Sequence, residues 1–348
     1  MSRWNQKRKR WLDYHARLGN KRKKKNRQIH GISSSKSFSL GASTTRITSH
    51  DKKPIVIQTP PRNFSLIDNP EETMSFFMDF KNEIDRNQYG TQFFVDSKNV
   101  ESVTVDALIY LIAILQNDKH NNFLNFSFAG NYPENEAAKK IYTECGFTDY
   151  VHSNMKSLPE SNDRIRIICG VDNSPESARE ICDFVMETLG KLRKDILPIQ
   201  KVLVELMSNV YHHAYEKNSF MAKRWYMYAE HSGDFVRCIF VDTGYGIAKT
   251  ARKNFGEKFR TFFGMRVDDS RIIESVFNGD FRTATNLRYR GNGLLAVREN
   301  VGYDIFKGFE VFSGRGRCII PKDDNPDEIL SHRYENTLYG TLYQFVVR

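Results

Sequence analysis

An apolar strand runs straight into a glycine-rich turn in the segment Phe240-Val241-Asp242-Thr243-Gly244-Tyr245-Gly246-Ile247. The two alternate glycines let the backbone approach a bound molecule closely. Asp242 ends the strand, where its carboxylate can accept a hydrogen bond from an exocyclic amine. The strand is the second of a predicted hairpin, because Ser232-Gly233-Asp234 separates it from another aromatic and β-branched run, Trp225–His231.

A helix with a polar stripe precedes this hairpin. Between Asp195 and Lys217, apolar residues recur at helical spacing. They are Ile199, Val202, Leu203, Leu206, Met207 and Val210. Glu205, Asn209 and His213 follow one another at i, i+4 and i+8, so their side chains lie on one side of the helix. Because these side chains are poor core fillers, the stripe predicts either a polar site or a solvated face.

Two further glycine motifs follow in the chain. Arg290-Gly291-Asn292-Gly293-Leu294 precedes a helical pattern, so its backbone N–H groups can hold phosphate at a helix N-terminus. Tyr339-Gly340-Thr341-Leu342 opens the last strand. Upstream, Ser174-Pro175-Glu176 predicts a capped helix that continues to about Gly190.

In this order the motifs resemble those of the Bergerat-fold, or GHKL, ATPases. The similarity spans about Arg164–Arg348, and its closest match is the anti-sigma-factor kinase group, whose N-box reads Glu-x-x-x-Asn-x-x-x-His-x-Tyr. Glu205, Asn209, His213 and Tyr215 fill that pattern here. The resemblance implies an α/β sandwich, with a mixed sheet and helices on one face, over residues 159–348.

The resemblance also implies ATP and Mg²⁺ as cofactors. Glu205 would be the catalytic base, and Asn209 would help to coordinate Mg²⁺. The other nucleotide-binding residues would be His213 of the N-box, Asp242 at the adenine amine, Gly244, Gly246 and Ile247 around adenine and ribose, Thr341 at adenine, and Gly291, Gly293 and Leu294 at the phosphates. Arg288 and Arg290 would complete the neutralisation of the triphosphate. A mobile lid is expected over residues 248–289, and Leu295 replaces the third glycine usual in the second glycine box.

The sequence pattern predicts a small α/β domain over residues 53–158. The expected strands are Pro54–Ile57, Gln92–Asp96 and Phe123–Phe128, and the expected helices are Glu71–Asp85, Val105–Gln116 and Glu134–Cys145. This order resembles the STAS domain of anti-sigma-factor antagonists. Thr104 would stand in for the serine that is phosphorylated there, although the Asp-Ser-x-Gly turn is missing. A structural or partner-docking role is the alternative.

Residues 1–52 form a basic tail and a Ser/Gly-rich linker. The first 50 residues hold 14 Lys or Arg and one acid, whereas the whole chain carries a net charge of +10. Residues 3–27 therefore suit nucleic-acid phosphates, an anionic lipid surface or an acidic protein groove, or they act as a solubilising arm.

Composition excludes several other classes. The longest uncharged apolar stretch, Ala107–Leu115, has nine residues, well below the roughly 20 that a membrane span needs. The five cysteines are scattered without a CxxC pair, and the N-terminus is charged rather than apolar. These features predict a cytoplasmic protein with reduced thiols and without a zinc site.

Three functions remain open. Only 55 residues follow Gly293, so we expect no transducer domain. The first function is an ATP/Mg-binding regulator, a slow ATPase whose nucleotide state controls homodimerisation or binding of a protein partner. The second is an anti-sigma-type Ser/Thr protein kinase, and the third is an ATP-gated nucleic-acid-binding or defence module that acts through the basic tail.

Overall fold

A computed structural model describes residues 55–87, 91–116, 127–151, 161–212, 223–253, 267–280, 293–320 and 329–348. All of them belong to one compact unit, Ser37–Arg348. The predicted basic tail and the predicted domain boundary near residue 158 lie outside the described residues. None of the helices in the described ranges is both long and apolar enough to cross a bilayer.

A five-stranded sheet dominates the second half of the chain, in the order β6-β7-β8-β10-β9. The strands are β6 (Arg164–Gly170), β7 (Trp225–Ser232), β8 (Phe235–Asp242), β9 (Phe306–Ile320) and β10 (Leu330–Val347). Every neighbouring pair is antiparallel. The expectation of a mixed sheet is therefore wrong.

The connections explain the antiparallel pairing. Two helices, α6 (Pro175–Leu189) and α7 (Arg193–His212), join β6 to β7. Because the chain runs out along one helix and returns along the other, β7 starts where β6 ends, and Gly170 pairs with Trp225. Strands β7 and β8 form the predicted hairpin, with Gly233 at a φ of 66° in the turn.

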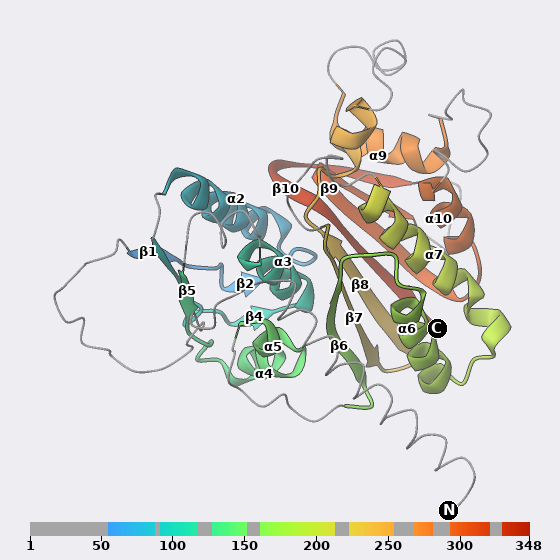
Figure 1. Cartoon of the computed structure of the whole chain (residues 1–348), viewed down its shortest axis with the longest axis horizontal. Helices are drawn as coiled ribbons and strands as arrows, with labels where there is room; N and C mark the ends of the chain where they lie inside the picture. The colour runs from blue at the N-terminus through green and yellow to red at the C-terminus, as the bar shows by residue number, and fades with distance from the viewer. Residues whose placement is uncertain are drawn as a thin grey trace, which may run out of the picture. The chain divides into compact units, whose positions relative to one another are not determined.

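Helices cover one face of this sheet, as expected. They are α6, α7, α9 (Asp269–Asn278) and α10 (Gly293–Val301), and Figure 1 shows them along that face. Their apolar residues share a core with Met227, Phe240 and Tyr343 of the sheet. Helix α6 starts and stops as predicted, because Ser174 Oγ accepts from the N–H of Ser177 at 3.3 Å and Gly190 is left-handed.

The first half of the chain is a small α/β arrangement. A parallel sheet has the order β1-β3-β5, and β2 pairs in parallel with β4. The strands are β1 (Ile55–Gln58), β2 (Asn63–Phe64), β3 (Gln92–Val95), β4 (Ser102–Val103) and β5 (Ser127–Gly130). The helices are α2 (Pro70–Arg86), α3 (Val105–Leu115), α4 (Glu136–Glu144) and α5 (Phe147–Val151). The three predicted helices are confirmed. Of the expected strand Phe123–Phe128, the last two residues belong to β5, and residues 123–126 lie outside the described ranges.

The two halves share a hydrophobic core. Helix α3 is apolar on all sides, and ten of its eleven residues are buried. The same core includes Tyr226, Val241 and Leu342, which lie on the face of the five-stranded sheet opposite α6 and α7. That sheet is therefore packed on both faces, by α6, α7, α9 and α10 on one side and by the first half of the chain on the other.

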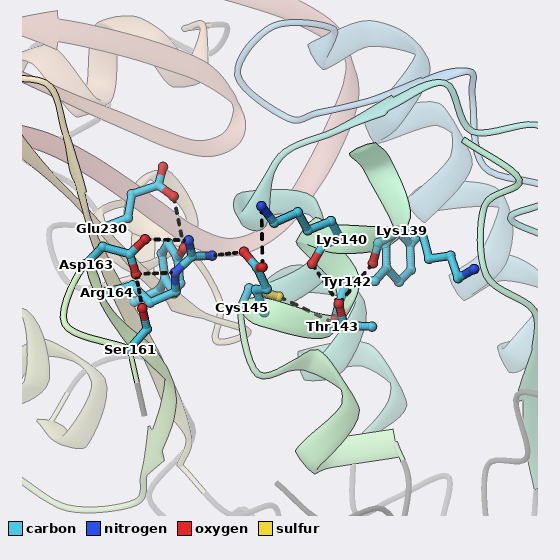
Figure 2. Close-up of polar contacts among 11 residues, drawn as sticks. Lys139, Lys140, Tyr142, Thr143, Cys145, Ser161, Asp163, Arg164 and Glu230 are labelled. Carbon is cyan, nitrogen blue, oxygen red and sulfur yellow. Dashed lines mark hydrogen bonds and ion pairs between the residues drawn. The ribbon is translucent and has the colours of Figure 1, made fainter. Parts of the chain in front are cut away.

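An ionic contact also joins the halves. Arg164, at the start of β6, pairs with Glu144 of α4 at 3.0 Å and with the adjacent Asp163 at 2.9 Å. Figure 2 shows the Arg164 side chain between Asp163 and the end of α4. Arg166 pairs with Asp149 of α5 at 3.1 Å. Both arginine side chains are less than one-fifth exposed, so these pairs are screened less than surface pairs.

Candidate functional site

Helix α7 presents the predicted polar stripe beside its buried face. Val202, Leu206 and Val210 are buried against the sheet and fix how the helix is rotated about its axis. Glu205 and Asn209 follow one turn apart on the neighbouring stripe and are half-buried. The third member of the stripe, His213, lies outside the described residues.

The start of α10 faces this stripe. A Cβ atom on Gly293 would lie 3.0 Å from Asn209 Oδ1 and 3.1 Å from Glu205 Oε2. Glycine at this position thus allows the backbone of α10 to approach a carboxylate and an amide from a different helix. Leu294, next to it, is partly buried and packs on the core under α7.

Glu205 and Asn209 are both partly removed from water. Nδ2 of Asn209 is buried and has no hydrogen-bond partner among the residues that the structure describes. Burial also raises the pKa of the Glu205 carboxyl. A buried unpartnered donor is costly, and such groups in native proteins are often satisfied by a ligand, an ion or an ordered water. Asn209 and Glu205 therefore form a partly desolvated polar pair that lies directly against the start of α10.

A second polar group lies at the end of β8. Asp242 pairs with Thr341 of β10, and Thr341 pairs with Ser313 of β9, so the three side chains form a row across the sheet. The row lies on the same face as Phe240, two residues before Asp242, which is the face that α7 covers. Asp242 and the α7 pair thus occupy the same side of the sheet.

The environment of Asp242 is dry. Its side chain is buried, and burial raises the pKa of its carboxyl to about 7. The N–H of Gly244 donates to Oδ1 at 2.8 Å, and hydrogen bonds from Gly244 and Thr341 oppose this rise in the pKa. A carboxyl that is partly protonated at neutral pH can either accept or donate a hydrogen bond.

The glycine turn after Asp242 is tied to the last two strands. The N–H of Ile247 donates to Ser313 Oγ at 2.8 Å, and Ser313 Oγ donates to the carbonyl of Gly340 at 2.9 Å. A cavity of about 270 Å³ opens beside the turn. Its lining includes Gly244, Tyr245, Gly246, Lys249, Arg252 and Tyr339.

The structure brings several predicted site residues together. Glu205, Asn209 and Gly293 form one group, and Asp242, Gly244, Ile247 and Thr341 form a second, with Gly246 on the adjoining cavity. Arg288, Arg290 and Gly291 lie outside the described residues.

Two expectations change. Part of the expected lid, α9, is built into the sheet-covering layer, because Ile272, Ile273 and Phe277 are fully buried there. Thr104 precedes α3, but its hydroxyl oxygen is buried and therefore closed to a modifying enzyme in this conformation.

Sequence reasoning missed Ser313. A single serine in a long strand carries no local signal, and its role follows from partners 66 and 27 residues away. Comparison of the chain with protein-family models and with curated proteins finds no match.

Proposed function

We propose that residues 159–348 form a Bergerat-type domain that binds ATP with Mg²⁺ between α7, the glycine turn after β8 and the start of α10. One observation carries the proposal: Gly293 lies against Glu205 and Asn209, two residues that are far from it in the sequence. A helix N-terminus, an amide and a carboxylate then lie next to one another. This combination suits a metal-bound phosphate chain.

The phosphate side is built by α10 and α7. Helix α10 has nine residues, and its first backbone N–H groups and its macrodipole favour an anion. Asn209 would hold Mg²⁺ through its carboxamide oxygen, and its unpartnered Nδ2 would donate to a phosphate oxygen. Bound Mg²⁺ supplies neutralisation of charge on the phosphate oxygens. Arg288, Arg290 and Gly291 would add donors on the same side.

The base side is built by the row across β8, β10 and β9. Asp242 would accept a hydrogen bond from the adenine amine, and Thr341 would contact the same edge of the base. Gly244, Gly246 and Ile247 would shape the space around adenine and ribose. The buried position of Asp242 supports this role, because a hydrogen bond in a dry site discriminates strongly between bases that have and lack the amine.

Glu205 is the proposed general base. Its carboxylate would take a proton from water as the water oxygen attacks the γ-phosphorus, the bond from phosphorus to the bridging oxygen breaks, and ADP leaves. Burial raises the pKa of Glu205, which makes its carboxylate a stronger base. With a protein hydroxyl in place of water, the same step would be that of a Ser/Thr kinase.

The proposed role is regulation by nucleotide state. ATP hydrolysis would be slow, and ATP binding would change self-association or the affinity for a protein partner, with the STAS-like first half as the docking element. The packing of this half against the same sheet supports communication between the two. We place the protein in the cytoplasm, since Cys145, Cys182, Cys238 and Cys318 are buried thiols and not disulfides.

Turnover of γ-labelled ATP by the purified full-length chain tests the proposal. We expect release of labelled phosphate without label on protein, and loss of release in Glu205→Gln with ATP binding retained. Glu187→Gln, at an exposed position on the neighbouring helix α6, is the matched control and should keep full activity. Hydrolysis that survives in Glu205→Gln would contradict the assignment of the base, and label on a protein partner would favour the kinase.

A further inference from the structure

Strand β10 contains an irregularity just before Thr341. Leu338 pairs with Gly314 and Thr341 with Ser313, so Tyr339 and Gly340 have no register partner on β9. Gly340 has a φ of 87°, and a Cβ atom on it would lie 2.0 Å from the carbonyl oxygen of Asp242. The conformation of these two residues therefore sets where Thr341 lies relative to Asp242.

The hydroxyl of Tyr110 forms hydrogen bonds with the backbone at this irregularity. Tyr110, on α3, donates to the carbonyl oxygen of Tyr339 at 2.8 Å and accepts from the N–H of the same residue at 2.9 Å. A phenol can donate and accept at once, so one side chain replaces both ladder hydrogen bonds that the irregularity removes.

The position of Tyr110 is itself fixed. Its side chain is 1% exposed, and the ring of Phe77 packs edge-on against it with 4.7 Å between centroids. Burial raises the pKa of the Tyr110 hydroxyl, so it stays protonated and remains a donor at physiological pH.

Hydrogen bonds continue from this contact to the glycine turn. The carbonyl of Gly340 accepts from Ser313 Oγ, and Ser313 Oγ accepts from the N–H of Ile247. A continuous path therefore runs from α3, in the first half of the chain, through β10 to the turn that follows Asp242.

We propose that Tyr110 is a positioning residue for the base side of the nucleotide site, through which the first half of the chain sets base selectivity. This inference rests on the proposed ATP-binding function. Without the hydroxyl, the N–H and carbonyl of Tyr339 would lose these two hydrogen bonds, and residues 339–340 would shift to find other partners. Thr341 would then leave its place beside Asp242, and preference for a base with an exocyclic amine would fall.

Calorimetry on the full-length chain tests the inference with two nucleotides, Mg-ATP and Mg-ITP, which carry an amine and a carbonyl at the same ring position. The wild type should prefer ATP. In Tyr110→Phe the affinity for ATP should fall about tenfold, or about 1.4 kcal/mol, while the affinity for ITP changes little. Tyr226→Phe is the matched control, because that buried hydroxyl also joins the two halves but donates to Gln116 Oε1, at 3.2 Å.

The ratio of the two affinities is the deciding quantity. A general loss of stability would weaken the binding of both nucleotides alike. Loss of positioning would lower the ratio of the affinity for ATP to that for ITP, and it would do so in Tyr110→Phe only. A wild-type ratio in Tyr110→Phe would overturn the inference and leave the proposed function intact. A wild-type chain that binds neither nucleotide would overturn the proposed function instead.

Hydrogen exchange on the unmodified protein gives an independent check should Tyr110→Phe fold poorly. Saturating Mg-ATP should slow amide exchange in peptides that cover residues 338–342 and in those that cover α3. Protection at residues 338–342 without any change in α3 would overturn the coupling.

Discussion

Gly293, the first residue of α10, lies so close to Asn209 of α7 that a Cβ atom on the glycine would be 3.0 Å from Oδ1 of the amide. The two residues are on different helices, and α10 can meet α7 this closely only because position 293 lacks a side chain. The contact defines the phosphate side of the proposed site.

Gly293→Ala should therefore weaken nucleotide binding without unfolding the protein. Alanine is a better helix former than glycine, so the thermal midpoint should stay within a few degrees. The added methyl would push the start of α10 away from Asn209 and Glu205, and we expect a loss of affinity for Mg-ATP of about tenfold or more. Gly308→Ala, where an added Cβ meets nothing within 4 Å, is the control and should bind normally. Unchanged affinity for Mg-ATP in Gly293→Ala would contradict the placement of α10 at the proposed nucleotide site.

The stability of the protein should fall between about pH 4 and pH 7. Burial raises the pKa of Asp242 to about 7 and that of Asp106 to about 6, from an ordinary value of 3.8. The folded state thus binds more protons than the unfolded chain in this window, and the free energy of unfolding decreases as pH rises. Each group contributes a slope of up to about 1.4 kcal/mol per pH unit.

Urea unfolding at pH 5 and pH 7.5 measures this dependence. Asp242→Asn should show a smaller decline than the wild type, because an amide does not titrate. Asp304→Asn, at an exposed position, should keep the full decline. An equal decline in Asp242→Asn and the wild type would mean that Asp242 ionises normally.

Ser313→Ala should destabilise the fold by roughly 1–3 kcal/mol. The variant removes the acceptor for the N–H of Ile247 and the donor to the carbonyl of Gly340, and both groups belong to buried backbone. Ser331→Ala removes a bond from Ser331 Oγ to Glu274 on the exposed surface and should cost less than about 0.5 kcal/mol. Equal unfolding midpoints for the two variants would show that the hydrogen bonds of Ser313 contribute no more to the stability of the fold than an exposed hydrogen bond does.

Local patterns predicted much of the fold. Helical spacing located α7, the Ser174-Pro175-Glu176 cap located α6, and an apolar run located α3. The Ser232-Gly233-Asp234 turn located the β7–β8 hairpin. These features depend on neighbours in the sequence, where periodicity and turn chemistry act directly. The direction of the strands was predicted wrongly, because it follows from the paired helices α6 and α7 and not from any strand's own residues.

The candidate site residues remain a prediction, and the structure shows only which of them lie together. Glu205, Asn209 and Asp242 stand out because polar groups interrupt apolar patterns. By contrast, the roles of Tyr110 and Ser313 arise from partners 229 and 27 residues away. No local pattern encodes such contacts, since they form only when the whole sheet is packed.

The basic tail should carry any binding to nucleic acid. Removal of residues 1–48 takes away 14 basic residues and leaves the described fold untouched. We expect the full chain to bind RNA or DNA with an affinity that falls steeply with salt, and the shortened chain to lose that binding. Fluorescence anisotropy at several salt concentrations measures both. Salt-sensitive binding retained by the shortened chain would assign it to the folded part.

Calorimetric titration of Mg-ATP into the purified full-length chain is the most direct test of the account. We expect binding of one nucleotide per chain, and at least a tenfold loss of affinity in Asn209→Ala, which removes a side-chain Nδ2 that has no partner within the described structure. Asn300→Ala, whose amide donates to the carbonyl of Ala296, should bind as the wild type does. A folded wild-type chain that takes up no adenine nucleotide would contradict the account.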